Sequence, residues 1–166
     1  MAQPKHSCLI LACGNTQRSD DGVGPWLAAW AQERFHDEPG VKVVSRHQWT
    51  PDLAQDVASA ESVLFIDCST ESAPGAVRLA PVETAVETQA LATHHLGAAQ
   101  LLALGRKLYD SLPANALQLA VGAGSTELGE EFSQPVLDAL ASACAKIEET
   151  VTRLLSGVAP GIAPRE

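Results

Sequence analysis

Apolar residues recur along the chain with two different periods. Short, mostly apolar runs at 8–12, 62–67 and 117–121 are typical of strands that are buried in a sheet. Apolar and polar residues alternate over 41–47, which predicts a further strand, and a short edge strand is expected over 76–79. The chain therefore contains at least the strands of a small sheet.

Apolar residues spaced three and four positions apart predict helices between these strands. One helix should run from about Val23 to Phe35, a short one should follow Thr50-Pro51, and one should begin at Ala98. The buried face of the first is expected to hold Val23, Trp26, Leu27 and Trp30, and that of the third Leu101, Leu102, Gly105, Leu108 and Tyr109. The last helix should begin near Ser133 and Pro135, and its apolar stripe is expected to be Leu137, Leu140, Ala141, Cys144, Ile147, Val151, Leu154 and Leu155.

Strands and helices alternate along the chain, and this order predicts the fold class. Alternation of this kind is typical of a mostly parallel sheet between two helical layers. We therefore expect an α/β protein, a three-layer α/β/α sandwich with a central sheet of about five strands. With 166 residues, 46% of them hydrophobic, and no internal repeat, a single domain is expected over 1–155. The Gly- and Pro-containing segment 156–166 is expected to be a flexible tail.

The charge balance excludes some classes of partner. The formal net charge is −9, from 11 Lys and Arg against 20 Asp and Glu, and no basic cluster occurs. Nucleic acids and anionic membranes are therefore poor partners. No apolar run approaches the length of a membrane span, and we expect a cytoplasmic protein. The four cysteines lack CxxC spacing, so buried free thiols are expected, with a reactive thiol at Cys13 or Cys68 as the alternative.

Two adjacent carboxylates, Asp20 and Asp21, lie between the first strand and the first helix. In an open α/β sheet this connection lies at the carboxyl edge, where ligands bind. A carboxylate here could cap the following helix. Capping needs one carboxylate only, and two neighbouring negative charges favour a bound cation or proton. Both interpretations remain open at this point.

Further candidate ligands are expected at the same edge of the sheet. Asp67 ends the strand 62–67, where it could also close an Asx-turn. His94 and His95 precede the helix that begins at Ala98, and since adjacent side chains diverge, at most one should share a site with the aspartates. Two carboxylates and an imidazole suit a divalent metal with open positions. The motifs of Ser-His-Asp hydrolases, P-loop enzymes and zincins are absent from the sequence.

The segment Gly14-Asn15-x-x-Arg18-x-Asp20-Asp21-Gly22-Val23-Gly24 resembles the signature of the hydrogenase maturation endopeptidases. The resemblance spans about 9–155. It continues in order through Asp67, Pro74-Gly75, Thr93-His94-His95-Leu96-Gly97 and Gly129-x-x-Phe132-Ser133.

That family removes a C-terminal extension from the large-subunit precursor of nickel-iron hydrogenases after nickel has been inserted. The resemblance implies that Asp21, Asp67 and His94 are the catalytic residues and bind Ni²⁺, which would arrive with the precursor, so that the resting enzyme need not hold metal. It implies a supporting role around the site for Gly14, Asn15, Asp20, Gly22, Gly24 and His95. The expected partner is the large-subunit precursor, and the protein itself is expected to be a monomer.

The chain departs from the family pattern in two loops. Ala12-Cys13-Gly14-Asn15 replaces a frequent Gly-x-Gly-Asn, and the loop after the second strand is not Gly-rich, which resembles a different subgroup. In that loop Gln48, Trp49 and Asp52 are candidate substrate contacts, with core packing as the alternative for Trp49. Two other functions remain open: a non-catalytic chaperone that binds metal or precursor, and a hydrolase or phosphate-binding enzyme that uses 122–129 as an anion loop.

Overall fold

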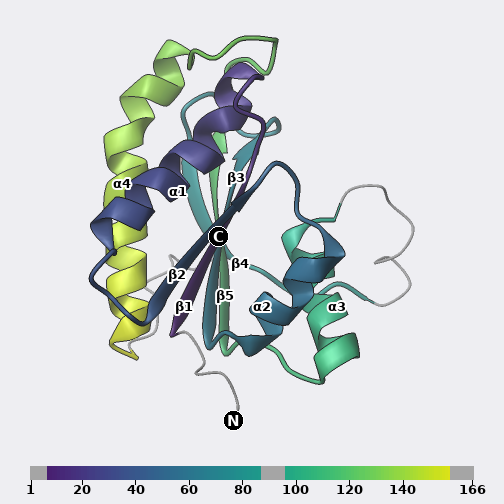
Figure 1. The fold of residues 1–166 in the computed structure, drawn as a ribbon. Helices are drawn as coiled ribbons and strands as arrows, with labels where there is room; N and C mark the ends of the chain where they lie inside the picture. Colours follow the sequence, from purple (N-terminus) through teal and green to yellow (C-terminus); the bar gives the residue numbers. More distant parts are fainter. Residues whose placement is uncertain (1–6, 87–95, 158–166) are drawn as a thin grey trace, which may run out of the picture.

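A five-stranded sheet forms the centre of the protein (Figure 1). The computed structural model describes residues 7–86 and 96–157. The strands are β1 (Cys8–Cys13), β2 (Val41–Arg46), β3 (Ser62–Ser69), β4 (Val77–Pro81) and β5 (Asn115–Gly122). Their spatial order is β2-β1-β3-β5-β4, and β4 is antiparallel to β5 at one edge while the other pairs are parallel.

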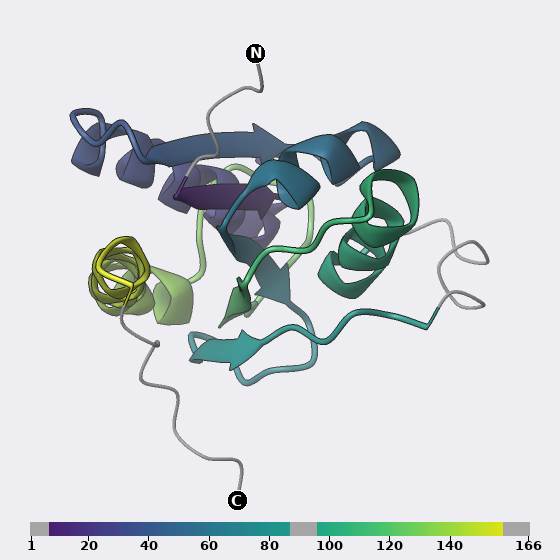
Figure 2. The ribbon, with the colours of Figure 1, turned by 90° about the horizontal axis from the view of Figure 1, so that it is seen from below.

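Helices cover both faces of this sheet (Figures 1 and 2). The helices are α1 (Val23–Arg34), α2 (Ala54–Ser59), α3 (Ala98–Tyr109) and α4 (Gln134–Leu155), with short 3₁₀ turns η1 (Ser19–Gly22) and η2 (Pro51–Leu53). Residues of α1 and α4 pack on one face of the sheet, and residues of α2 and α3 pack on the other. The predicted three-layer α/β/α sandwich is confirmed.

The central strands β1 and β3 are largely apolar because both of their faces are buried. In β1, Ile10 belongs to the core under α1 and α4, while Leu9 and Leu11 belong to the core under α2 and α3. All three are buried. In β5 only the side chains that face α1 and α4 are apolar and buried. Leu117 and Leu119 lie on that face, whereas Gln118 between them is half-buried.

The buried faces of the helices differ in part from the predicted stripes. Trp26 in α1 is 41% exposed and Leu137 in α4 is 47% exposed, whereas both were expected in the core. In α4 the small residue Ala143 belongs instead to the core shared with α1 and the sheet, since small side chains let the elements approach closely. The expected core positions at the end of α3, Leu108 and Tyr109, are also exposed.

Two strand ends also differ from the prediction. β3 continues to Ser69, so Asp67 does not end the strand but pairs with Ala120 of β5 inside it. β2 ends at Arg46, one residue earlier than expected.

Some predicted features lie outside the described residues. They are His94 and His95 and most of the expected tail. Among the helices that are described, none combines the length and the apolar character needed to cross a membrane.

Two glycines fix the path of the chain between β1 and α1. A Cβ atom on Gly24 would lie 2.2 Å from the carbonyl oxygen of Cys13, and one on Gly14 would lie 2.0 Å from the carbonyl oxygen of Asp21. Any side chain at either position would therefore push backbone against backbone. This close approach holds Asp21 beside the carboxyl end of β1.

The substitution Gly24→Ala should lower the free energy of unfolding by about 2 kcal/mol, because the overlap with the Cys13 carbonyl forces the backbone apart. Urea unfolding monitored by circular dichroism measures this. Gly40→Ala is the control, since the nearest atom to its Cβ is the Ser7 hydroxyl oxygen at 3.1 Å, which can move. Equal unfolding midpoints for the two variants would contradict the argument.

Candidate functional site

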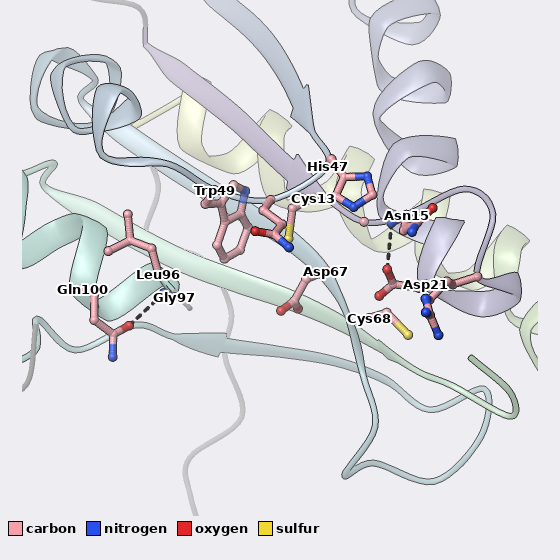
Figure 3. Close-up of a pocket in the computed structure, with 13 residues that line it drawn as sticks. Cys13, Asn15, Asp21, His47, Trp49, Asp67, Cys68, Leu96, Gly97 and Gln100 are labelled. Atoms are coloured by element: carbon pink, nitrogen blue, oxygen red, sulfur yellow. Dashed lines mark hydrogen bonds between the residues drawn. The ribbon is translucent and has the colours of Figure 1, made fainter. Parts of the chain in front are cut away.

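A cavity of about 570 Å³ opens at the carboxyl ends of β1, β2 and β3 (Figure 3). This is the edge at which ligands bind in open α/β sheets. Both Asp21 and Asp67 line the cavity. The other lining residues are Cys13, Gly14, Asn15, Arg18, His47, Gln48, Trp49, Cys68, Leu96, Gly97 and Gln100.

The carboxylate of Asp21 is oriented by the loop that follows β1. The backbone N–H of Asn15 donates a hydrogen bond of 2.7 Å to Asp21 Oδ2, drawn as a dashed line in Figure 3. The side chain of Asn15 is held in turn, because its Oδ1 accepts a hydrogen bond of 2.9 Å from the N–H of Gln17. Asp21 thus faces the cavity, and in the part of the chain that the structure describes its second oxygen, Oδ1, accepts no hydrogen bond.

Asp67 lines the cavity with a carboxyl group whose pKa departs from its ordinary value. Its pKa is raised to about 6, chiefly because the group is buried. A hydrogen bond from the side chain of Gln118 lowers the pKa, while the negative charge of Asp21 adds to the rise. Asp67 Oδ1 is buried and finds no hydrogen-bond partner in the described part of the chain. An unpaired buried oxygen is costly, and in a cavity it marks a place where a ligand would bind.

Asp20 has a different environment from its neighbour. It is fully buried, and its Oδ2 accepts hydrogen bonds from the N–H groups of Gly124 (2.7 Å) and Ser125 (2.9 Å) and from the hydroxyl of Ser133 (2.7 Å). Oδ1 accepts a fourth from the N–H of Ser133 at 2.8 Å. Burial raises the pKa of Asp20, but these hydrogen bonds outweigh it, and the pKa lies below its usual value. Asp20 thus ties η1 to the loop after β5 and to the start of α4.

These contacts exclude two of the sequence-based alternatives. The residue that precedes α1 is Gly22, and neither Asp20 nor Asp21 caps that helix with its side chain, so the capping interpretation is wrong. The anion-loop interpretation of 122–129 also fails, because two of its N–H groups already donate to the Asp20 carboxylate.

The two thiols of the cavity are protonated at neutral pH. Burial raises the pKa of Cys13 and of Cys68 to about 12, and the negative charges of Asp21 and Asp67 add to the rise in both. Since the thiolate is the nucleophile, neither cysteine is activated for covalent catalysis. The alternative of a reactive thiol is therefore not supported by the electrostatics.

Some of the remaining candidate residues line the cavity and others do not. Gln48 and Trp49 line it. Trp49 is also buried against Phe65, with ring centroids 5.2 Å apart, so its side chain belongs to the core as well as to the cavity wall. Asp52 does not line it and accepts a hydrogen bond from the Thr50 hydroxyl. Gly22 and Gly24 are buried.

The two candidate histidines, His94 and His95, lie outside the described residues. Leu96 and Gly97, which follow them directly, line the cavity. Within 7–86 and 96–157, no three His, Cys, Asp or Glu side chains are grouped in a way that suits a metal ion.

Sequence analysis missed three polar residues of the cavity, Arg18, His47 and Gln100. His47 could have been found, because it directly follows β2 and so lies at the same edge of the sheet as Asp67. Arg18 lies inside the signature segment, but its position alone gave no chemical role.

Comparison with known proteins supports the resemblance seen in the sequence. No protein-family model matches the chain, and neither does any curated protein. Among solved structures, the hydrogenase maturating endopeptidase HybD from E. coli has a TM-score of 0.69 at 19% identity, covering 90% of this chain and 93% of that one. The [NiFe] hydrogenase maturation protease HycI from Thermococcus kodakarensis KOD1 has a TM-score of 0.67 at 22% identity, covering 87% and 92%.

A third similar structure has a higher sequence identity. The [NiFe] hydrogenase maturation protease HybD from Thermococcus kodakarensis is 26% identical, with a TM-score of 0.63 and coverage of 85% of this chain and 96% of that one. The match therefore extends over nearly the whole of each chain. The protein has the fold of the hydrogenase maturation endopeptidases, and its resemblance to that family is confirmed.

Proposed function

We propose that this protein is an endopeptidase that removes a C-terminal extension from the large-subunit precursor of a nickel-iron hydrogenase. The observation that carries the proposal is the Asp67 carboxyl group, with its raised pKa and unpartnered oxygen, in one cavity with Asp21. Solved structures with this fold are named as hydrogenase maturation proteases. A cavity of about 570 Å³ has room for a segment of polypeptide around one peptide bond.

In this proposal nickel is part of the substrate. Asp21, Asp67 and His94 would bind it, since carboxylate and imidazole groups are suitable ligands for such an ion. When present it would polarise the carbonyl group of the cleaved bond. This requirement would restrict cleavage to precursors that already carry the metal.

The side chains of the cavity would hold the substrate in place. Because Asp67 Oδ1 is buried and finds no hydrogen-bond partner in the described residues, the Asp67 carboxylate is well suited to bind the metal ion that the precursor carries. The N–H of Asn15 keeps Asp21 turned into the cavity. Trp49, buried against Phe65, forms a rigid apolar wall that keeps bulk water from part of the site.

Intact-mass spectrometry of the nickel-loaded precursor, incubated with this protein, tests the proposal. We expect loss of one defined C-terminal peptide in the presence of nickel and no loss from a nickel-free precursor. Asp21→Ala and His94→Ala should each abolish cleavage, because each removes a ligand of the substrate-borne metal.

Asp37→Ala is the matched control, since Asp37 lies exposed in the turn after α1 and should not affect cleavage. Full processing by Asp21→Ala would contradict the assigned role of that residue. Binding of the precursor without any loss of mass would identify a chaperone in place of a protease.

A further inference from the structure

Asp67 lies between two cavities. A second cavity of about 370 Å³ shares Asp67 and Cys68 with the first. Its other lining residues are Ser69, Thr70, Glu71, Gln118 and Ala120. The two cavities therefore meet at the carboxyl group that has the raised pKa and the unpartnered oxygen.

The second cavity exists because the sheet extends beyond the helices that cover this face. Phe65, which pairs with Gln118, is buried in the core under α2 and α3. Two residues further along β3, on the same face, comes Asp67, which pairs with Ala120. In Figure 1 helices α2 and α3 lie over the lower part of this face, and Asp67, Gln118 and Ala120 are only half-buried. A strip of sheet next to Asp67 is thus open to a ligand.

We propose that this second cavity binds the start of the C-terminal extension, on the far side of the bond that is cleaved. The inference rests on the proposed function. Asp21 lines the first cavity only, so the metal-bearing body of the precursor must enter there. A polypeptide continues on both sides of the bond that is cleaved. The part of the peptide that follows the cleaved bond then passes Asp67 and enters the second cavity. That cavity shares Asp67 and Cys68 with the first.

The lining of the second cavity predicts what kind of peptide it accepts. Ser69 and Thr70 offer hydroxyl groups, Gln118 an amide, and Ala120 a small apolar floor. The Ser69 hydroxyl oxygen accepts hydrogen bonds from the N–H groups of Glu71 and Ser72, which hold this turn in place. Asp67 and Glu71 are acidic, and among residues 7–86 and 96–157 no Lys or Arg lines the cavity. The cavity therefore suits an extended peptide with uncharged or basic side chains and disfavours an acidic one.

The substitution Thr70→Trp tests this assignment, because Thr70 is exposed and a larger side chain there fills the cavity without entering the core. We expect kcat/KM for a precursor with its full extension to fall about tenfold or more, as steric exclusion from a subsite predicts. For a precursor shortened to one residue beyond the cleaved bond, the variant and the wild type should cleave at equal rates. Both rates are measured by mass spectrometry on nickel-loaded precursors.

Thr152→Trp is the matched control, since Thr152 is exposed on α4 and lines neither cavity. Its cleavage of both precursors should equal that of the wild type. Unchanged cleavage of the full-length precursor by Thr70→Trp would overturn the assignment, as would loss of binding to the mature subunit, which has no extension. If the wild type cleaves no precursor, the proposed function itself fails and this inference falls with it.

Discussion

Replacing Asp67 with asparagine should lower kcat/KM for cleavage of the nickel-loaded precursor by about a thousandfold, because a neutral amide is a much poorer ligand than a carboxylate for the metal ion that the precursor carries. Asparagine keeps the shape of the side chain, so the cavity and the contact with Gln118 are retained. The negative charge and the basic oxygen are removed. Initial rates of peptide release, measured for the wild type and the variant at pH 7.5, determine the ratio.

The same variant should remain folded. The pKa of Asp67 in the folded protein, about 6, lies above its ordinary value of 3.8, so the folded state binds the proton more tightly than the unfolded state does. The wild type therefore gains stability as the pH falls from above 6 to about 4, whereas the Asn variant lacks this gain. At pH 7.5 the variant should be at least as stable as the wild type in urea. A variant that cleaves at the wild-type rate would contradict the role of Asp67 at the reacting centre.

Replacing Asp20 with alanine should lower the free energy of unfolding by about 4 kcal/mol, because it removes the acceptor of four hydrogen bonds from a fully buried place. The donors that remain, on Gly124, Ser125 and Ser133, are then left without their partner. Urea unfolding at pH 7 gives the difference from the wild type.

Ser133→Ala provides the control for Asp20→Ala. It removes one hydroxyl donor and should cost about 1 kcal/mol. Because the pKa of Asp20 is lowered in the folded protein, its stabilisation is complete above the ordinary value of 3.8 and is lost as the pH falls through the lower, folded value. The difference between the wild type and Asp20→Ala should therefore shrink in acid. Equal unfolding midpoints for the wild type and Asp20→Ala at pH 7 would rule out this stabilising role.

The fold and the location of the site could be predicted from local sequence patterns. The runs that became β1 and β3 are apolar because neighbouring layers bury both of their faces, a requirement that the sequence records directly. Parallel strands end at a common edge, which brings Asp21 and Asp67 into one cavity although they are far apart in the sequence.

Other features depended on contacts that no local pattern records. Asp20 and Asp21 are chemically identical neighbours, and only the partners of Asp20 in residues 124–133 separate their roles. In α4 the predicted buried stripe included Leu137 because that residue is large and apolar. In the structure Leu137 is exposed and Ala143 is buried, since close packing of the helices favours a small side chain. The shape of the neighbouring layer decides which side of a helix is buried. The positions of small residues in the sequence say little about that shape.

The contacts of Asp20 also determine when the site can form during synthesis. Asp20 bonds to residues that follow it by 104 to 113 positions, and the last of them, Ser133, immediately precedes α4. While the chain is still emerging from the ribosome, the segment that holds Asp21 therefore lacks its anchor until residues 124–133 have been translated and have folded against it. A nascent or C-terminally truncated chain would carry every residue of the cavity and still lack the support of η1. The cavity should therefore take its folded form only after Ser133 has been made.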